Sequence, residues 1–238
     1  LISAYYLLPL YVMVVTSLKG MPEIRLGNIF APPVEITFEP WVKAWSEACT
    51  GLNCDGLSRG FWNSVAIVIP ATILSIAVAA VNGYALVNWR FKGSEVFFTI
   101  LIFGAFIPYQ VMLYPLVILL RDLGLYGTLW GLVIVHTIFG MPILTLLFRN
   151  YFTSVPEELF KAARVDGASK IQSFVLITLP HMRRYMELCV LLGAIYVVQN
   201  FDAVFTITSG GLGTANLPYF IYQTFYTAHD YGLASAAG

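Results

Sequence analysis

The chain has 238 residues with a formal net charge of zero, and 58% of its residues are hydrophobic. Only 11% are charged, against about 25% in an ordinary soluble domain, and the mean hydropathy is +0.77. This composition indicates a polytopic membrane protein with one transmembrane domain over residues 1–238. The zero net charge argues against a nucleic-acid partner.

Apolar stretches predict five transmembrane helices, of which the first is truncated and the other four can each cross a hydrocarbon core about 30 Å thick. The segment after Gly213 is expected to lie at the membrane interface and to lead into a sixth span. The chain begins without Met inside an apolar run, so we expect a fragment truncated at both ends, in which a missing signal peptide is uninformative. The predicted spans are residues 1–18, Trp62–Val87, Val96–Leu120, Tyr126–Phe148 and Tyr185–Thr208.

The distribution of Lys and Arg predicts the orientation of these spans. The turn at 89–94 contains Arg90 and Lys92, whereas the segment at 19–60 has at least as many acidic as basic residues. Cytoplasmic loops are enriched in Lys and Arg, so 19–60 is expected to be an external loop and 149–184 a cytoplasmic one. The basic residues of the 149–184 loop are Arg149, Lys161, Arg164, Lys170, Arg183 and Arg184.

The loop from Ser154 to Pro180 has the signals of two short helices. Ser154 with Glu157 forms a predicted capping box, and Pro156 falls in the first helical turn, where a missing N–H costs little. Gly167 is expected to end the first helix, since Gly takes the left-handed conformation without penalty. One side of this helix is apolar and contains Leu159, Phe160, Ala162, Ala163 and Val165.

A second capping box follows at once. Ser169 with Gln172 is expected to open a helix, and Pro180 is expected to limit it. The loop therefore predicts a helix–turn–helix with an apolar patch in an aqueous compartment. A connection that only joined two membrane helices would not need this structure.

The spacing of Ala162-Ala163, Gly167 and Ile177 to Pro180 resembles the EAA loop of permease subunits in binding-protein-dependent ABC importers. The resemblance implies an all-α polytopic membrane protein with the MetI-like permease fold, and a first loop helix that docks on a cytoplasmic ATPase subunit. Lys161 stands where the family motif opens with Glu, so Glu157 or Glu158 is expected to supply the acidic contact. The implied ATPase-coupling residues are Glu157, Glu158, Leu159, Phe160, Lys161, Ala162, Ala163, Asp166 and Gly167.

Other segments are similar to carbohydrate importers of the maltose type. These are Thr16 to Lys19, Phe61 to Ser64 and Leu123 to Trp130, which match one permease partner, and the run FTITSGGLGTANLPYFIYQTF, which is more similar to the longer partner. The resemblance therefore implies a sugar or related polyol as substrate. It further implies two ATPase subunits, a second and non-identical permease subunit, an extracytoplasmic binding protein that meets residues 19–60 and 209–225, and a bacterial or archaeal cytoplasmic membrane.

The sequence contains no motif of an enzyme active site. Its three His residues are scattered without HExxH or zinc-ligand spacing, so no metal site is expected. A P-loop is also absent. If transport is driven by ATP, then the ATP and Mg²⁺ must bind another polypeptide, and this chain binds no cofactor.

Polar residues within spans are candidates for a substrate path, because burying them in lipid is costly unless they pair or line water. Amides and carboxylates bond hydroxyl groups, and neighbouring aromatic faces cover C–H surfaces, which suits a sugar. The alternative for each residue is an interhelical hydrogen bond or core packing. The candidates are Tyr109, Gln110, Tyr196, Gln199, Asn200, Asp202 and Phe205.

Cys49 and Cys54 lie in the predicted external loop. Outside a bacterial inner membrane the environment is oxidising, so the two residues form either a small disulfide or two unpaired thiols. Cys189 lies in a predicted span and is interpreted as a small packing residue.

Two other functional classes remain open. A secondary transporter would use an ion gradient and usually shows inverted repeats, which are not evident here. A membrane scaffold protein would explain the docking loop but not the polar residues in the spans. Stimulation of ATP hydrolysis by a loaded binding protein would separate an importer from both.

Overall fold

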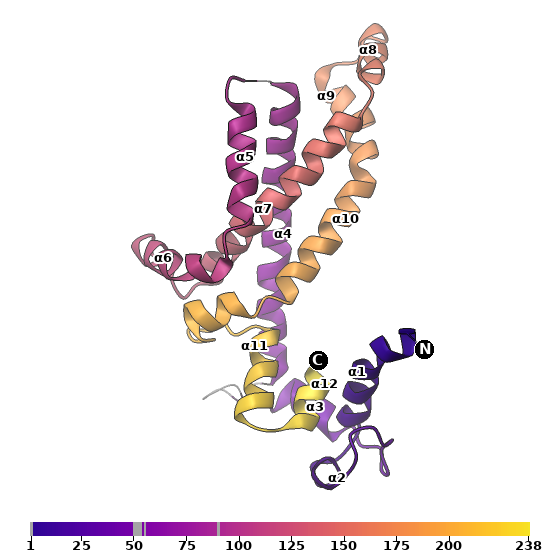
Figure 1. Cartoon of the computed structure of the whole chain (residues 1–238), viewed down its shortest axis with the longest axis vertical. Coiled ribbons are helices and arrows are strands. Elements are labelled where there is room, and N and C mark those ends of the chain that lie inside the picture. Colours follow the sequence, from indigo (N-terminus) through magenta and orange to yellow (C-terminus); the bar gives the residue numbers. More distant parts are fainter. Residues whose placement is uncertain (1, 50–53, 55, 90) are drawn as a thin grey trace. The chain divides into compact units, whose positions relative to one another are not determined.

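The structure of the chain is a computed structural model that describes residues 2–49, 54, 56–89 and 91–238 (Figure 1). These residues form helices and connecting loops, without a β-strand among them. Contacts divide the chain into two compact units: residues 1–66 with 200–238 form the first unit, and residues 67–199 form the second. The single transmembrane domain stays a prediction.

The helices of the first unit lie near the two ends of the sequence. They are α1 (Ile2–Ser17), α2 (Met21–Leu26), α3 (Glu39–Ser46), η2 (Val204–Thr208), α11 (Leu217–Tyr222), η3 (Gln223–Thr227) and α12 (Tyr231–Ala237).

The second unit contains the long helices and the loop between them. Its first helix, α4, begins within the first unit. The elements are α4 (Leu57–Asn88), α5 (Ser94–Ala105), α6 (Tyr109–Asp122), α7 (Leu129–Ser154), α8 (Glu157–Val165), α9 (Lys170–Ser173), η1 (Phe174–Thr178) and α10 (Leu179–Val198).

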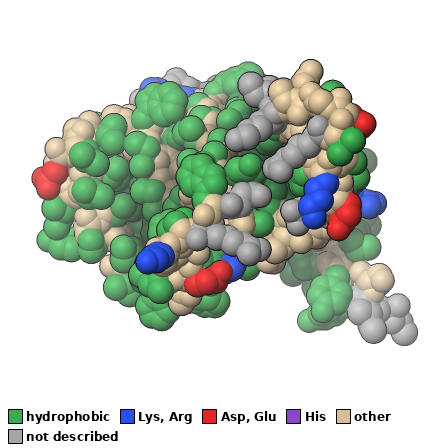
Figure 2. Space-filling view, turned by 90° about the horizontal axis from the view of Figure 1, so that it is seen from above, with side chains coloured by type: hydrophobic (Ala, Val, Ile, Leu, Met, Phe, Trp, Pro, Cys, Tyr) green, Lys and Arg blue, Asp and Glu red, His purple; other side chains and the backbone are tan. Residues whose placement is uncertain are grey.

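Within the described residues, α4 and α7 are long and apolar enough to cross a membrane, and α5 with α6 adds a third span if the bent pair counts as one. α1 contributes a shorter apolar helix over Tyr5–Ser17. Hydrophobic side chains cover much of the face drawn in Figure 2. The spans predicted at Trp62–Val87 and Tyr126–Phe148 correspond to α4 and α7.

The predicted continuous span Val96–Leu120 is wrong, because two helices occupy this stretch. α5 ends at Ala105 and α6 begins at Tyr109, with a bend of 104° between them. Pro108 stands at the break and immediately precedes α6. Proline has no N–H to donate and disfavours a helical conformation in the residue before it, so the chain turns here.

The predicted helix end at Pro180 is also wrong. α9, η1 and α10 follow one another without a gap from Lys170 to Val198. The π-turn η1 lies immediately before the proline, and the Leu179 N–H donates to Phe174 O, five residues earlier. A π-turn changes the hydrogen-bond register of a helix, which lets Pro180 be included without ending it.

The fifth span, predicted as Tyr185–Thr208, is likewise not one helix. α10 ends at Val198, residues 199–201 are irregular, and the π-helical segment η2 begins at Val204. Polar side chains at Gln199 and Asn200 fall in this break. Asn200 Oδ1 accepts a hydrogen bond from Ala203 N at 3.1 Å, so the asparagine caps the following turn instead of extending α10.

The core of the second unit forms where α4, α7 and α10 meet. A Cβ on Gly83 would lie 2.7 Å from Phe148 Cβ and 2.9 Å from Arg149 N, so only glycine lets α4 approach α7 this closely. Cys189 is fully buried in this core, which confirms its interpretation as a packing residue. The core residues are Ala79, Leu144, Phe148, Tyr151, Phe152, Met182 and Cys189.

The first unit is built around α12, which packs against α1 and α3. Its small core contains Ala48, Leu57, Phe220 and Ala237. Lys19, only 2% exposed, donates from Nζ to Asn28 O at 3.1 Å and so closes the segment that follows α1.

Candidate functional site

α8 does not begin as the sequence predicts. Ser154 is the last residue of α7, and its Oγ donates to Tyr151 O at 2.7 Å, so it does not cap α8. Pro156 precedes α8 and its carbonyl accepts from Leu159 N at 3.3 Å. The predicted capping box of Ser154 with Glu157 is therefore wrong, because α7 extends further than the apolar run that defined it. The side chain of Glu157 lies outside the described residues.

The end of α8 has the expected glycine. Gly167 has φ of +78°, in the left-handed region. Ala168 N donates to Ala163 O at 2.9 Å and Asp166 N donates to Ala162 O at 3.0 Å. The bond from Ala168 back to Ala163 is the long hydrogen bond of a Schellman motif, which satisfies a carbonyl at the helix end. Gly167 thus ends α8 as predicted.

The second capping box is confirmed. Ser169 N donates to Gln172 Oε1 at 2.8 Å, and Gln172 N donates to Ser169 Oγ at 3.2 Å. These reciprocal bonds fix the start of the helix that becomes α10. The turn between α8 and α9 is therefore held at both ends by local hydrogen bonds, and Figure 1 shows the two short helices as a bent pair.

The exposed surface of α8 is partly apolar. Leu159 is 39% exposed and Val165 is 87% exposed, and Ala162 is also exposed. Phe160 is half-buried and Ala163 is buried, so these two side chains already contact the rest of the chain. Val165 was not among the predicted coupling residues, although it belongs to the apolar side that the sequence defines. The charged residues Glu158, Lys161 and Asp166 are exposed beside it.

The end of α7 that leads into the predicted coupling loop is tied to α5. Arg149 Nη2 lies 2.6 Å from Glu95 Oε1, and the Arg149 guanidinium carbon lies 4.0 Å from the centre of the Phe98 ring. Arg149 is therefore one basic residue of the predicted cytoplasmic loop with a structural role of its own.

The predicted substrate-path residues fall in both units. Gln110, in the first turn of α6, and Gln199, at the end of α10, are exposed. Tyr196 is 47% exposed on α10. The side chain of Tyr109 lies outside the described residues. These four residues belong to the second unit, and the remaining three belong to the first. The substrate path as a whole stays a prediction.

In the first unit, Asp202 and Phe205 are exposed, whereas Asn200 is half-buried. The Asn200 carbonyl accepts from Asn216 Nδ2 at 2.9 Å, in addition to the cap that its side chain provides. For Asn200, the structure therefore shows the structural hydrogen bonds that were the alternative to a role in binding.

Phe205 belongs to a group of aromatic rings. Its centroid lies 4.9 Å from that of Phe201 and 5.5 Å from that of Tyr222, and Phe201 lies 4.9 Å from Tyr222. Tyr219 flanks the group and accepts a hydrogen bond from Gln223 Nε2 at 2.9 Å. Sequence reasoning missed the two tyrosines. Their spacing of three residues in the YFIY run, on the same side of a helix, was the available signal.

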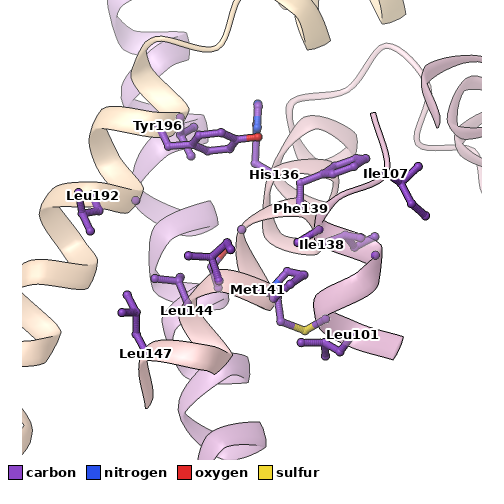
Figure 3. A pocket seen from close by; sticks show the side chains of 18 of the residues that line it. Leu101, Ile107, His136, Ile138, Phe139, Met141, Leu144, Leu147, Leu192 and Tyr196 are labelled. Carbon is purple, nitrogen blue, oxygen red and sulfur yellow. The ribbon is translucent and has the colours of Figure 1, made fainter. Parts of the chain in front are cut away.

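A cavity of about 780 Å³ lies within the second unit, between α4, α5, α7 and α10 (Figure 3). Most of its lining is apolar, with polar atoms from Thr72, Ser75, His136 and Tyr196. His136 is 3% exposed, and Figure 3 shows the Tyr196 side chain pointing toward it. Thr72 Oγ1 is buried with no hydrogen-bond partner in the part of the chain that the structure describes. Only Tyr196 was predicted from the sequence, because the other three become neighbours through helix packing.

A loop in the first unit is held rigidly by polar contacts. Asn63 Nδ2 donates to the carbonyls of Gly213 and Ala215 at 2.8 and 2.9 Å, and Leu217 N donates to Ser64 Oγ at 3.1 Å. The structure also joins Cys49 and Cys54 by a disulfide. These links fix two segments that the sequence predicts to lie outside the membrane.

The structure thus combines helices long and apolar enough to cross a membrane with a capped helix–turn–helix that follows one of them, α7. The model of the family described as "Binding-protein-dependent transport system inner membrane component" matches residues 71–238, more than half of the chain. The chain belongs to this family.

Individual proteins agree with this assignment. The chain is 31% identical to the osmoprotective compounds uptake permease protein GgtD of Synechocystis over 75% of this chain and 60% of that protein. It is 28% identical to the multiple sugar-binding transport system permease protein MsmG of Streptococcus mutans, over 97% of this chain and 81% of that protein. It is 29% identical to the xylose/arabinose import permease protein XacI of Haloferax volcanii, over 87% of this chain and 70% of that protein. The chain thus spans less than two thirds of GgtD and more of the other two.

The fold agrees with a solved structure. A chain from the crystal structure of a bacterial ABC transporter involved in the import of the acidic polysaccharide alginate superimposes with a TM-score of 0.78. The match covers 99% of this chain and 86% of that chain at 21% identity. The predicted all-α permease fold is confirmed.

Proposed function

We propose that this chain is a transmembrane subunit of an ATP-driven importer for a sugar or related polyol. An extracytoplasmic binding protein delivers the substrate, and a second, non-identical permease subunit completes the path. Two separate ATPase subunits bind ATP and Mg²⁺, and this chain binds no cofactor. The residues 154–180 couple ATP hydrolysis to transport in a bacterial or archaeal cytoplasmic membrane.

The structure of α8 is the observation that best supports this function. A nine-residue helix that presents Leu159 and Val165 to solvent, with acidic and basic residues beside them, matches what a docking helix needs. The Schellman motif at Gly167 holds it folded before a partner binds. A preformed helix loses less conformational entropy on docking than a loop does.

The link from α8 to the membrane supports coupling. α9, η1 and α10 contain 4, 5 and 20 residues without a break, and at 1.5 Å per residue this helix is about 43 Å long. It begins directly after the short turn that follows α8. A displacement of α8 therefore moves the end of a helix that is long enough to extend through the bilayer.

The substrate class is supported by the relatives and by the aromatic group of the first unit. MsmG, XacI and an alpha-glucoside permease, AglG of Rhizobium meliloti, are named for sugars, whereas GgtD is named for osmoprotective compounds. The rings of Phe201, Phe205 and Tyr222 provide apolar faces for C–H surfaces of a sugar. Gln199 and Asp202 are exposed groups able to bond hydroxyls.

Docking of the ATPase is tested by truncating the apolar side of α8. Phe160→Ala is expected to weaken binding of the ATPase subunits by about 2 kcal/mol, roughly thirtyfold in Kd, as for an interface anchor. The control is Leu26→Ala on the predicted external side, where Leu26 is 92% exposed and its truncation leaves docking unchanged. Equal binding of Phe160→Ala and the unaltered chain, at unchanged thermal stability, contradicts the assignment.

Transport itself is tested in proteoliposomes that contain the purified complex. We expect uptake of a labelled sugar that needs ATP and the binding protein, and hydrolysis that the loaded binding protein stimulates. Uptake that stops when an ion gradient is dissipated, with ATP present, would identify a secondary transporter instead. Neither uptake nor stimulated hydrolysis would favour the scaffold alternative.

A further inference from the structure

α3 of the first unit has one side packed and one side exposed. Ala44 is 3% exposed, and a Cβ on Gly232 of α12 would lie 3.7 Å from Pro40 Cγ, so Pro40 and Ala44 face α12. The exposed side holds three large apolar residues: Trp41 is 47% exposed, Val42 is 59% exposed and Trp45 is 50% exposed.

A third side of α3 is charged. Lys43 Nζ lies 2.5 Å from Glu39 Oε1, and the two side chains are 52% and 63% exposed. A hydrogen bond from Lys43 to Glu39 and the charge of Glu39 raise the pKa of Lys43. At about 100° per residue, Glu39 and Lys43 lie roughly opposite Trp41 and Trp45 around the helix. The charged and the aromatic sides therefore face opposite directions.

The aromatic side continues onto the start of α4. The ring of Trp45 lies 5.9 Å from that of Phe61, which lies 5.5 Å from that of Trp62. Phe61 is 38% exposed and Trp62 is 64% exposed. Three aromatic side chains thus form one exposed patch beside Trp41, near the start of a helix long and apolar enough to cross a membrane.

The neighbours of α3 are the ends of apolar helices. A Cβ on Gly232 would lie 3.6 Å from Lys19 O, just after α1, and 3.7 Å from Pro40, at the start of α3. A Cβ on Gly238 would lie 3.3 Å from Met13 Sδ, so α12 runs antiparallel along α1. α3 therefore begins beside the end of α1 and the start of α12.

We propose that α3 lies in the outer lipid–water interface, with Trp41, Val42 and Trp45 inserted into the lipid together with Phe61 and Trp62. Tryptophan favours this depth, because its ring is apolar and its N–H donates to headgroups or water. A helix that is aromatic on one side and charged on the opposite side has the pattern of an interfacial helix. The Glu39–Lys43 side then faces water, and a binding protein that arrives from there does not meet the tryptophans.

Fluorescence quenching tests the position of the tryptophans. In the full chain, Trp62→Phe, Trp89→Phe and Trp130→Phe leave Trp41 and Trp45 as the only tryptophans. The protein is reconstituted in phosphatidylcholine vesicles whose acyl chains carry bromine near the headgroup or near the chain end. We expect stronger quenching by bromine near the headgroup, and little quenching by aqueous iodide. Quenching by iodide alone would overturn the proposal.

Cysteine labelling supplies a matched pair. Val42→Cys and Lys43→Cys are neighbours on α3, and the remaining cysteines are a disulfide and the buried Cys189. In vesicles, a membrane-impermeant maleimide is expected to label Val42→Cys about tenfold more slowly than Lys43→Cys. Equal rates would overturn the proposal. So would rapid labelling of Val42→Cys that slows only when the binding protein is added, since the patch would then be a protein contact.

Discussion

Replacing Gly167 with Ala tests whether a folded α8 is needed for coupling. Gly167 has φ of +78°, and a Cβ built on it meets no atom within 4 Å. The substitution therefore introduces no collision with the rest of the chain. Its whole effect comes from the left-handed backbone, which a residue with a Cβ adopts at a cost of about 1–2 kcal/mol.

This cost falls on the Schellman motif. If the alanine introduced by Gly167→Ala leaves the left-handed region, the hydrogen bond from Ala168 N to Ala163 O is lost and the last turn of α8 opens. Docking then has to refold that turn, so the affinity for the ATPase subunits is expected to fall by about fivefold to thirtyfold. Gly167→Asn is expected to have a smaller effect, because Asn tolerates the left-handed region.

The assay is binding of the purified ATPase subunits to the reconstituted chain, together with hydrogen exchange of the α8 amides. Gly124→Ala is the matched control: Gly124 has φ of +68° and also meets nothing within 4 Å, but it lies between α6 and α7. The control is expected to lose similar stability and to keep normal docking. The reasoning is refuted if Gly167→Ala docks normally, or if both variants lose docking equally.

Three further predictions concern stability. Gly83→Ala places a Cβ 2.7 Å from that of Phe148 and is expected to lower the free energy of unfolding by about 1–3 kcal/mol, seen as a lower melting temperature. In contrast, a Cβ on Gly104 meets no atom within 4 Å, so Gly104→Ala is expected to leave the melting temperature unchanged or to raise it. Ser169→Ala removes a capping-box bond and is expected to cost about 1 kcal/mol, seen as faster hydrogen exchange at the start of α9; unchanged exchange contradicts this. Thr72→Val removes a buried hydroxyl that has no hydrogen-bond partner among the described residues, and it is expected to raise the free energy of unfolding by about 1 kcal/mol, so a lower melting temperature speaks against it.

Features that depend on neighbours in sequence were predicted well. The capping box of Ser169 with Gln172 and the left-handed Gly167 need only residues within a few positions, and both are present in the structure. α4 and α7 follow from long apolar runs, although α4 begins before its predicted span, and α7 both begins and ends later than predicted. The extension of α7 to Ser154 is what removed the first capping box.

The effects of proline were not predictable from sequence. Pro70 and Pro142 lie inside α4 and α7, Pro108 separates α5 from α6, and Pro180 is included through a π-turn. Each proline removes one N–H and crowds the preceding turn. Whether the helix continues depends on what else satisfies the freed carbonyl, and that is decided by packing partners far away in sequence.

The predicted substrate path shows the same limit of prediction from sequence. Tyr196 lies on α10 and Gln199 lies directly after its end, and the two are candidates of the same predicted cluster. The structure gives Tyr196 a different set of neighbours, among them His136 of α7, which lies well inside a span and gave no local signal. Residues that approach one another only through helix packing cannot be grouped by spacing.

The π-turn before Pro180 joins the predicted coupling loop to the long helices α7 and α10 from two directions. Along the chain, the capped start of α9 continues into α10, so the turn after α8 leads directly into one long helix. From the side, Tyr151 OH of α7 donates to Thr178 O at 3.4 Å, and the Tyr151 ring lies 4.7 Å from that of Tyr185. In the proposed coupling, a movement of α8 would therefore reach both α7, which precedes it, and α10, which follows it, through contacts on either side of Pro180.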